Sequence, residues 1–171
     1  MEQFIIEGGT PLTGTIRPAG NKNSALPLLA ASLLTDQPVI LHNIPLIRDV
    51  LTMRQLIEDV GASVTEIDAH TWRIEAKTLN KTEPDPAICR IIRASLLLAA
   101  PLLARRGHVE LPLPGGDVIG RRRIDSHLIA FAALGAEVKY NARKQIKTTQ
   151  LHGGKILMDE ASVTATENAI M

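Results

Sequence analysis

Two segments of the 171-residue chain repeat one plan, and this internal repeat restricts the possible folds strongly. The stretch ALPLLAASLLTDQPVILHNIP, which begins at Ala25, matches ASLLLAAPLLARRGHVELPLP, which begins at Ala94. Further on, LIEDVGASV (56–64) matches AFAALGAEV (130–138). Such self-similarity predicts two copies of one structural unit. The second copy carries a few extra residues around GGDVIGRRR, and extra loop residues on a repeated scaffold often carry function.

The hydropathy pattern predicts helix, strand, helix, strand, strand in each unit. The first helices (25–34 and 94–104) are apolar nearly all round, which is typical of helices buried on every side. The second helices are amphipathic and should end at Gly61 and Gly135 as C-caps. Their apolar positions are Val50, Met53, Leu56, Ile57 and Val60 in one unit, and Ile124, Leu128, Phe131 and Leu134 in the other.

The predicted strands 64–67, 72–75 and 138–141 alternate polar and apolar residues, so each should have one wet face. Buried helices beside half-exposed strands predict an α/β (α+β) fold with sheets outside and helices inside. A third unit then begins: KILMD (155–159) predicts a strand, and 162–171 predicts the start of another buried helix. A frayed tail is the alternative. Because the chain ends where a helix should start, we expect an incomplete third unit.

Composition excludes several classes of protein. A net charge of +1 with 45% hydrophobic residues argues against disorder and against a generic nucleic-acid or membrane-surface protein. No apolar run approaches the roughly 20 residues that span a bilayer, and no signal peptide is evident, so we expect a cytoplasmic protein. The lone Cys89 excludes an internal disulfide and is expected to be a small buried residue. Five scattered histidines predict no metal site, and no cofactor is expected.

Two predicted helix starts carry a cation. Lys22 and Asn23 follow a glycine and open the first apolar helix, where backbone N–H groups and the helix dipole favour an anion. The alternative is a solvated helix start with Asn23 or Ser24 as a plain N-cap. The repeat places Arg93 at the equivalent start in the second unit, so the two cations could converge on one anionic ligand.

The segment LPLPGGDVIGRRRIDSHL (111–128) is the most informative. Its first six residues predict an irregular, mobile loop, after which Asp117 stands alone among small and apolar residues. Arginines at 121–123 then open a helix. Adjacent cations there are unfavourable unless an anion neutralises them, so we expect a bound phosphate or diphosphate, with a solvated basic turn as the alternative. An aspartate beside an anion site could act as a general acid/base.

Four motifs together resemble the enolpyruvyl transferase family: GNKNSALP (20–27), RASLLLAAPLLA (93–104), LPGGDVIGRRRIDSHL (113–128) and MDEASVTATENAIM (158–171). The resemblance spans the whole chain but well under half of a full member. It implies an inside-out α/β barrel built from βαβαββ units, incomplete here. Residues 1–21 would supply a leading strand region to the second domain. Residues 22–171 would form two repeats, and the start of a third, of the first domain.

The resemblance also implies transfer of enolpyruvyl from phosphoenolpyruvate to the 3′-hydroxyl of UDP-N-acetylglucosamine, the first committed step of peptidoglycan synthesis. The catalytic residues would be Asp117, protonating C3 of phosphoenolpyruvate, and Lys22. The substrate-binding residues would be Lys22, Asn23, Arg93, Arg122, Arg123, Ile124, Asp125, Ser126, Glu160, Ala161, Ser162 and Val163. Because the family's site lies between two domains, this chain alone is expected to be inactive.

Three positions depart from the usual family pattern. Asp117 stands where most members have cysteine, although an aspartate variant also occurs; a carboxylate resists alkylation, so resistance to fosfomycin is expected. Arg123 replaces a frequent proline, and Glu160 replaces a frequent lysine. Two alternative functions stay open. One is a shikimate-pathway enolpyruvyl transferase, which should lack the GGD loop in this form. The other is a non-catalytic fragment that binds anions or associates with itself through an apolar edge.

Overall fold

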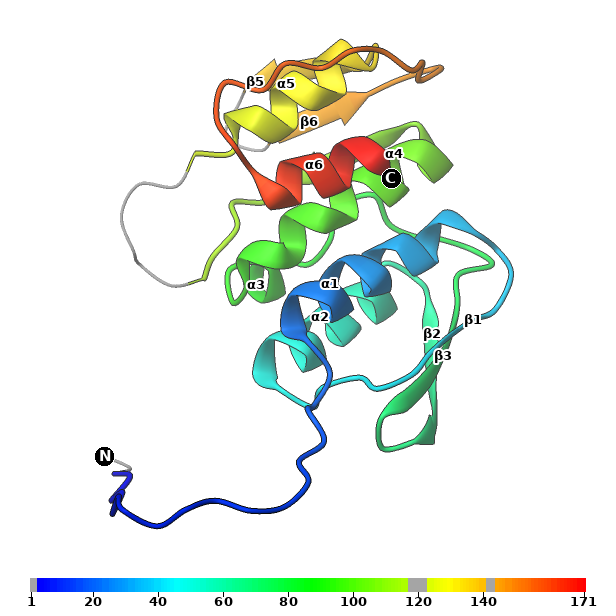
Figure 1. Ribbon diagram of the computed structural model, residues 1–171. Coiled ribbons are helices and arrows are strands. Elements are labelled where there is room, and N and C mark those ends of the chain that lie inside the picture. The colour runs from blue at the N-terminus through cyan, green and yellow to red at the C-terminus, as the bar shows by residue number, and fades with distance from the viewer. Residues whose placement is uncertain (1–2, 117–122, 141–143) are drawn as a thin grey trace.

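The computed structural model describes residues 3–116, 123–140 and 144–171 (Figure 1). The first unit contains α1 (Lys22–Ala31), the 3-10 helix η1 (Ser32–Leu34), β1 (Val39–Leu41), α2 (Arg48–Asp59), β2 (Ser63–Asp68) and β3 (Thr71–Glu75). The second contains α3 (Pro86–Cys89), the 3-10 helix η2 (Arg93–Leu98), α4 (Ala99–Arg106), β4 (His108–Leu111), α5 (Asp125–Ala133), β5 (Glu137–Tyr140) and β6 (Lys144–Lys147). Helix α6 (Val163–Ile170) follows. The predicted order of elements in both units is confirmed.

Each unit builds its own antiparallel sheet, and the two sheets share one strand order. The orders are β1-β3-β2 and β4-β6-β5, so the last strand of each unit lies in the middle. Val39 pairs with Ile74 in the first sheet, and Val109 pairs with Ile146 in the second. In Figure 1, α1, α4 and α6 lie between the two sheets, whereas α5 lies beside β5 and β6. The predicted α+β class is confirmed, and the inside-out barrel stays a prediction.

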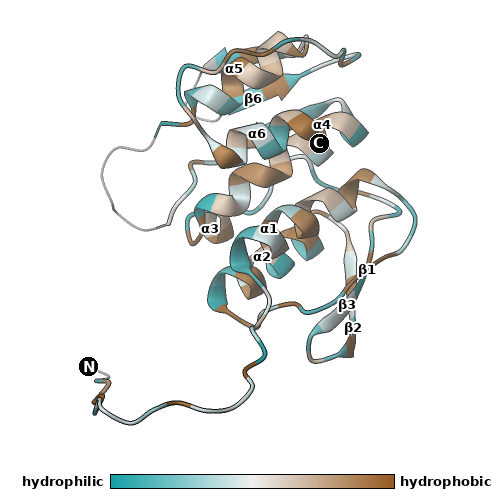
Figure 2. Ribbon diagram, in the orientation of Figure 1, coloured by the Kyte–Doolittle hydropathy of each residue, from teal (hydrophilic) through white to brown (hydrophobic). Residues whose placement is uncertain are grey.

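The core is aliphatic and continuous through both units. It contains the predicted apolar face of α2, where Val50, Met53 and Leu56 are fully buried. Trp72 and Phe131 are the largest buried side chains and contribute one aromatic group to each unit. Figure 2 shows apolar residues in the middle of α1 and in the stretch leading into α4, whereas the start of α1 is hydrophilic. The fold therefore buries the apolar middles of these helices and leaves the start of α1 exposed to water.

Glycines end the second helix of each unit, as predicted. Gly61 and Gly135 have φ of 114° and 94°, a left-handed conformation that favours glycine. A Cβ atom on Gly61 would also lie 2.8 Å from the carbonyl oxygen of Thr78. Both conformation and space therefore require glycine at this helix end.

The expectation that both first helices are buried on every side holds only for the second unit. There, the side chains from Ser95 to Leu103 are buried. In α1, however, Leu28 is 51% exposed, because no described element packs over that side of the helix. In β2, the pairing with β3 shifts register between Glu66 and Asp68, and Ile67 is exposed.

The third unit is predicted correctly at its helix and wrongly at its strand. Helix α6 buries Ala165 and Asn168 but exposes Val163 and Ile170. Residues 155–159 form no strand. Both described sheets take their strands from their own units, so this segment has no partner strand among the described residues. A β-strand needs such a partner because its backbone hydrogen bonds are made between strands.

Residues 3–19 run as an exposed segment away from the body of the molecule (Figure 1). Phe4 and Leu12 are more than 90% exposed within it. The assignment of residues 1–21 to another domain stays a prediction. Among the described residues, no helix combines the length and apolar character needed to cross a bilayer.

Candidate anion-binding site

The helices α1, α5 and α6 and the joined pair η2–α4 all begin on one side of the molecule (Figure 1). Lys22 is the first residue of α1, and Arg93 is the first residue of η2, so the repeat places these cations at equivalent positions, as predicted. Helix starts expose unpaired backbone N–H groups and the positive end of the dipole. This side of the molecule is therefore suited to anionic groups.

The N-cap of α1 lies two residues before Asn23, the nearer of the two alternatives. Asn21 is the N-cap, and its Oδ1 accepts hydrogen bonds from the backbone N–H of Asn23 at 2.7 Å and of Ser24 at 3.2 Å. The assignment of the cap to Asn23 or Ser24 is therefore wrong, because Asn21 keeps the extended backbone of a cap. Lys22 Nζ lies 2.9 Å from Asp49 Oδ2 on α2, and both side chains are partly exposed.

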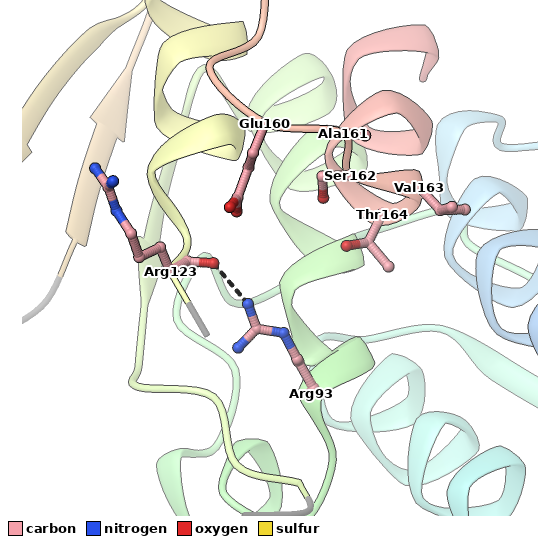
Figure 3. A pocket seen from close by; sticks show the side chains of 7 residues that line it. All are labelled: Arg93, Arg123, Glu160, Ala161, Ser162, Val163 and Thr164. Carbon is pink, nitrogen blue, oxygen red and sulfur yellow. Dashed lines mark hydrogen bonds between the residues drawn. The ribbon is translucent and has the colours of Figure 1, made fainter. Parts of the chain in front are cut away.

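A polar pocket of about 390 Å³ lies between the starts of η2, α5 and α6 (Figure 3). Its lining residues are Arg93, Arg123, Glu160, Ala161, Ser162, Val163 and Thr164. Six of these seven residues were predicted to bind substrate, and the seventh, Thr164, was not predicted. The pocket thus joins residues that lie about 70 positions apart in the sequence.

Two arginines and several carboxylates set the electrostatics of this pocket. Arg93 donates a 2.7 Å hydrogen bond to the main-chain oxygen of Arg123 (Figure 3). Arg123 Nε lies 2.6 Å from Asp125 Oδ2, and Arg123 Nη2 lies 3.8 Å from Asp159 Oδ2. The hydrogen bond from Arg123 lowers the pKa of Asp125. An external anion is therefore not needed to neutralise Arg123, because the chain supplies carboxylates of its own.

A second cavity, of about 210 Å³, adjoins the polar pocket and shares Arg93 and Thr164 with it. Lys22, Asn23 and Gly116 also line it. Lys22 and Asn23, two of the predicted substrate-binding residues, therefore face the same cavity as Arg93. Gly116 directly precedes Asp117, which lies outside the described residues together with Arg121 and Arg122.

Two further predicted residues, Ile124 and Ser126, lie at the start of α5 beside the polar pocket and do not line it. Ile124 precedes α5 and packs against the core. Ser126 is buried, and its Oγ lies 3.3 Å from Asp159 Oδ1 and 3.5 Å from Glu160 Oε1. Their roles in substrate binding stay predictions. Cys89 is 2% exposed, and burial raises the pKa of its thiol to about 11, in keeping with its predicted place in the core.

Sequence reasoning missed a buried polar group behind the pocket. His127 is 2% exposed and Asn168 1% exposed, and His127 Nε2 lies 3.2 Å from Thr164 Oγ1. These residues come from α5 and α6, so no local spacing relates them. The one available signal was a histidine among apolar positions of an amphipathic helix.

Comparison with known proteins defines the class to which this fold and pocket belong. The family model for EPSP synthase (3-phosphoshikimate 1-carboxyvinyltransferase) matches residues 6–171, and the chain belongs to this family. A relative from Bradyrhizobium diazoefficiens, a UDP-N-acetylglucosamine 1-carboxyvinyltransferase, is 53% identical over 99% of this chain and 39% of its own length. The protein of the same name from Treponema denticola is 47% identical over 100% of this chain and 40% of its own length. The chain thus spans about two fifths of the length of these relatives.

Solved structures agree on the fold. The enolpyruvyl transferase NikO from Streptomyces tendae matches with a TM-score of 0.67 at 23% identity, over 84% of this chain and 32% of that one. EPSP synthase from Acinetobacter baumannii matches with a TM-score of 0.68 at 15% identity, over 91% of this chain and 37% of that one. The α+β arrangement described above is therefore that of the enolpyruvyl transferases.

Proposed function

We propose that this chain is the N-terminal part of an enzyme that transfers the enolpyruvyl group of phosphoenolpyruvate to the 3′-hydroxyl of UDP-N-acetylglucosamine. The observation that carries the proposal is that Lys22 and Asn23 line one cavity with Arg93, and that this cavity shares Arg93 and Thr164 with the polar pocket. Relatives that carry this activity in their names align over the whole chain. The enzyme would act in the cytoplasm, in the first committed step of peptidoglycan synthesis.

The two substrates suit the two cavities. Phosphoenolpyruvate carries a phosphate and a carboxylate, and Lys22 and Asn23 would bind it once Lys22 leaves Asp49. The diphosphate of the sugar nucleotide would take the polar pocket, with Arg93 between the two ligands. Placing both ligands together would supply much of the catalysis through proximity and orientation.

Asp117 would supply the proton in this reaction. It protonates C3 of phosphoenolpyruvate while the sugar hydroxyl adds at C2, which gives a tetrahedral adduct. Loss of phosphate from C2 and of a proton from C3 then restores the double bond in the product. Gly116 at the edge of the second cavity supports this role, because it brings the chain to the cavity one residue before Asp117.

In the complete enzyme, residues 22–171 would form part of one inside-out barrel domain, and residues 1–21 would join the other domain. The exposed apolar side chains of Phe4, Leu12 and Ile16 support this arrangement, because a second domain would cover them. In the isolated chain, the same side chains favour self-association. A clean monomer in size-exclusion chromatography would count against that second behaviour.

The proposal is tested with a chimera in which this chain replaces the aligned N-terminal part of the Bradyrhizobium diazoefficiens relative. We expect the chimera to release phosphate with phosphoenolpyruvate and UDP-N-acetylglucosamine, and not with shikimate 3-phosphate. The matched controls are the intact relative and the 171-residue chain alone, which should be inactive and bind UDP-N-acetylglucosamine weakly in calorimetry. A folded chimera that accepts only shikimate 3-phosphate would transfer the proposal to the shikimate alternative.

A further inference from the structure

Three polar side chains form a connected group behind the polar pocket. His127 on α5 and Asn168 on α6 are buried, and Thr164 at the start of α6 is half-buried and lines the pocket. Asn168 Nδ2 lies 2.8 Å from His127 Nδ1, and His127 Nε2 lies 3.2 Å from Thr164 Oγ1. The group therefore leads from the core to the pocket wall.

The backbone around Asn168 fixes the orientation of its amide. Its Oδ1 accepts a hydrogen bond from the N–H of Ala100 at 3.2 Å, and its Nδ2 donates to the carbonyl oxygen of Leu96 at 3.0 Å. A backbone N–H can only donate and a carbonyl oxygen can only accept. In a flipped amide, the Nδ2 donor would face the N–H of Ala100, and the Oδ1 acceptor would face the carbonyl oxygen of Leu96. Asn168 therefore presents a donor to His127 Nδ1.

This orientation fixes the tautomer of His127. Because Nδ1 receives a donor, Nδ1 must be the acceptor nitrogen, and the ring proton lies on Nε2. Burial, together with the nearby charge of Arg93, lowers the pKa of His127 to about 4, so the ring is neutral near pH 7. Nε2–H then donates to Thr164 Oγ1.

The hydroxyl of Thr164 is thereby set as a donor. Its oxygen accepts from His127, which leaves the hydroxyl hydrogen for an acceptor in the pocket. Figure 3 shows this oxygen turned toward the pocket, on the side where Arg93 and Glu160 lie. Anionic oxygens of phosphate accept hydrogen bonds and do not donate them, so they match a fixed donor flanked by Arg93 and Arg123.

We propose that Asn168 and His127 are positioning residues that hold the Thr164 hydroxyl as a hydrogen-bond donor to an anionic phosphate oxygen in the polar pocket. The proposal deepens the proposed function and rests on it for the class of ligand. A purely structural role explains the contacts of Asn168 with Leu96 and Ala100, but it predicts no effect of Thr164 on anion affinity.

The first test titrates the 171-residue chain with inorganic pyrophosphate and follows binding by NMR. Thr164→Val removes the hydroxyl at constant shape, and Thr164→Ser restores it. We expect about tenfold weaker binding for Thr164→Val, because a hydrogen bond to a charged group contributes about 1.5 kcal/mol or more. Thr164→Ser and the control Thr166→Val, two residues along the same helix, should stay within about twofold of the wild type. Equal affinities for all four proteins, or no binding by the wild type, would overturn the proposal.

The second test changes the tautomer without touching Thr164. In Asn168→Asp, a carboxylate faces His127 Nδ1 and accepts, so the proton should move to Nδ1. Nε2 then becomes the acceptor and takes the Thr164 hydrogen away from the pocket. Long-range ¹H–¹⁵N spectra of the histidine rings should show an Nε2–H ring in the wild type and Nδ1–H, or a doubly protonated ring, in the variant. An Nδ1–H ring in the wild type would overturn the assignment.

The two proposals fail separately. If the chimera transfers no enolpyruvyl group to UDP-N-acetylglucosamine but pyrophosphate binding still depends on Thr164, the proposed function is wrong and the donor role stands. If the chimera is active but Thr164→Val binds pyrophosphate as well as the wild type does, the donor role is wrong and the proposed function stands.

Discussion

Arg105, the penultimate residue of α4, donates a 2.8 Å hydrogen bond to the carbonyl oxygen of Ala76, directly after β3. The same nitrogen also donates to the carbonyl oxygens of Leu33 at 3.0 Å and Thr35 at 3.1 Å, and the other terminal nitrogen reaches that of Lys77 at 3.2 Å. One guanidinium of the second unit thus binds four carbonyl groups of the first unit. Only arginine offers this many donors in one plane.

Arg105→Ala is expected to lower the free energy of unfolding by about 2 kcal/mol or more, because it leaves partly buried carbonyl groups without a charged donor. Urea denaturation of the isolated chain measures the change. Arg106→Ala is the matched control, since Arg106 is exposed on the same helix turn, and it should shift stability by less than about 0.5 kcal/mol. Equal effects of both substitutions would contradict this role of Arg105.

Gly115→Ala is expected to displace the segment that leads to Asp117. A Cβ atom at this position would lie 1.5 Å from the carbonyl oxygen of Arg90. The backbone is held this close because the N–H of Gly115 donates a 3.0 Å hydrogen bond to the carbonyl oxygen of Cys89. The backbone must move to relieve this clash, so the free energy of unfolding should fall by about 1–3 kcal/mol. Thermal or urea unfolding measures the change. Gly153→Ala has open space around it and serves as the control. Unchanged stability of Gly115→Ala would rule out the close contact.

His127 is expected to make the chain less stable in mild acid. Its pKa is about 4 in the folded chain against an ordinary value of 6.5, so the unfolded chain binds more protons between these values. His127 therefore costs no stability above pH 6.5. The free energy of unfolding should fall by about 1.4 kcal/mol per pH unit below that value, and by about 3 kcal/mol in total near pH 4. In His127→Gln this part of the slope should disappear, whereas in the exposed control His42→Gln it should persist.

Asp117→Asn in the chimera is expected to abolish turnover while leaving substrate binding intact, because an amide cannot donate the proton to C3. Steady-state phosphate release and calorimetric binding of UDP-N-acetylglucosamine measure the two properties separately. Asn23→Asp offers a contrast, since an added negative charge beside Lys22 should weaken binding of phosphoenolpyruvate first. Unchanged turnover of Asp117→Asn would remove Asp117 from the mechanism.

Fosfomycin should leave the chimera active and inactivate its Asp117→Cys variant. A thiolate opens the epoxide and becomes alkylated, whereas a carboxylate resists this reaction. The time course of inactivation, with a mass increase on the Asp117→Cys variant only, checks the expectation. Alkylation of wild-type Asp117 would contradict it.

The repeat and the hydropathy pattern predicted most of the fold, because both depend on local periodicity. The alternation in 72–75 and the apolar spacing of α2 led directly to buried Trp72 and Met53. The errors lie where tertiary partners decide. Leu28 is exposed for lack of a covering element, and residues 155–159 form no strand because no partner strand lies beside them among the described residues.

Part of the candidate site could be predicted as well. Charged residues at helix starts, such as Lys22 and Arg93, stand out in the sequence, and the motifs named Glu160 and its neighbours. The ion pair of Lys22 with Asp49 could not be predicted, because it joins two helices whose relative placement depends on the packed core. The contact of His127 with Asn168 was hidden for the same reason.

Each unit keeps its strands in a separate sheet. The first helices of both units begin on the same side of the molecule, here called the rim, with Lys22 and Arg93 as their first residues. Duplication of such a unit adds one more positive charge to that rim without rebuilding any sheet. The ligand-facing chemistry can therefore accumulate copy by copy, while the solvent-facing strands diverge independently.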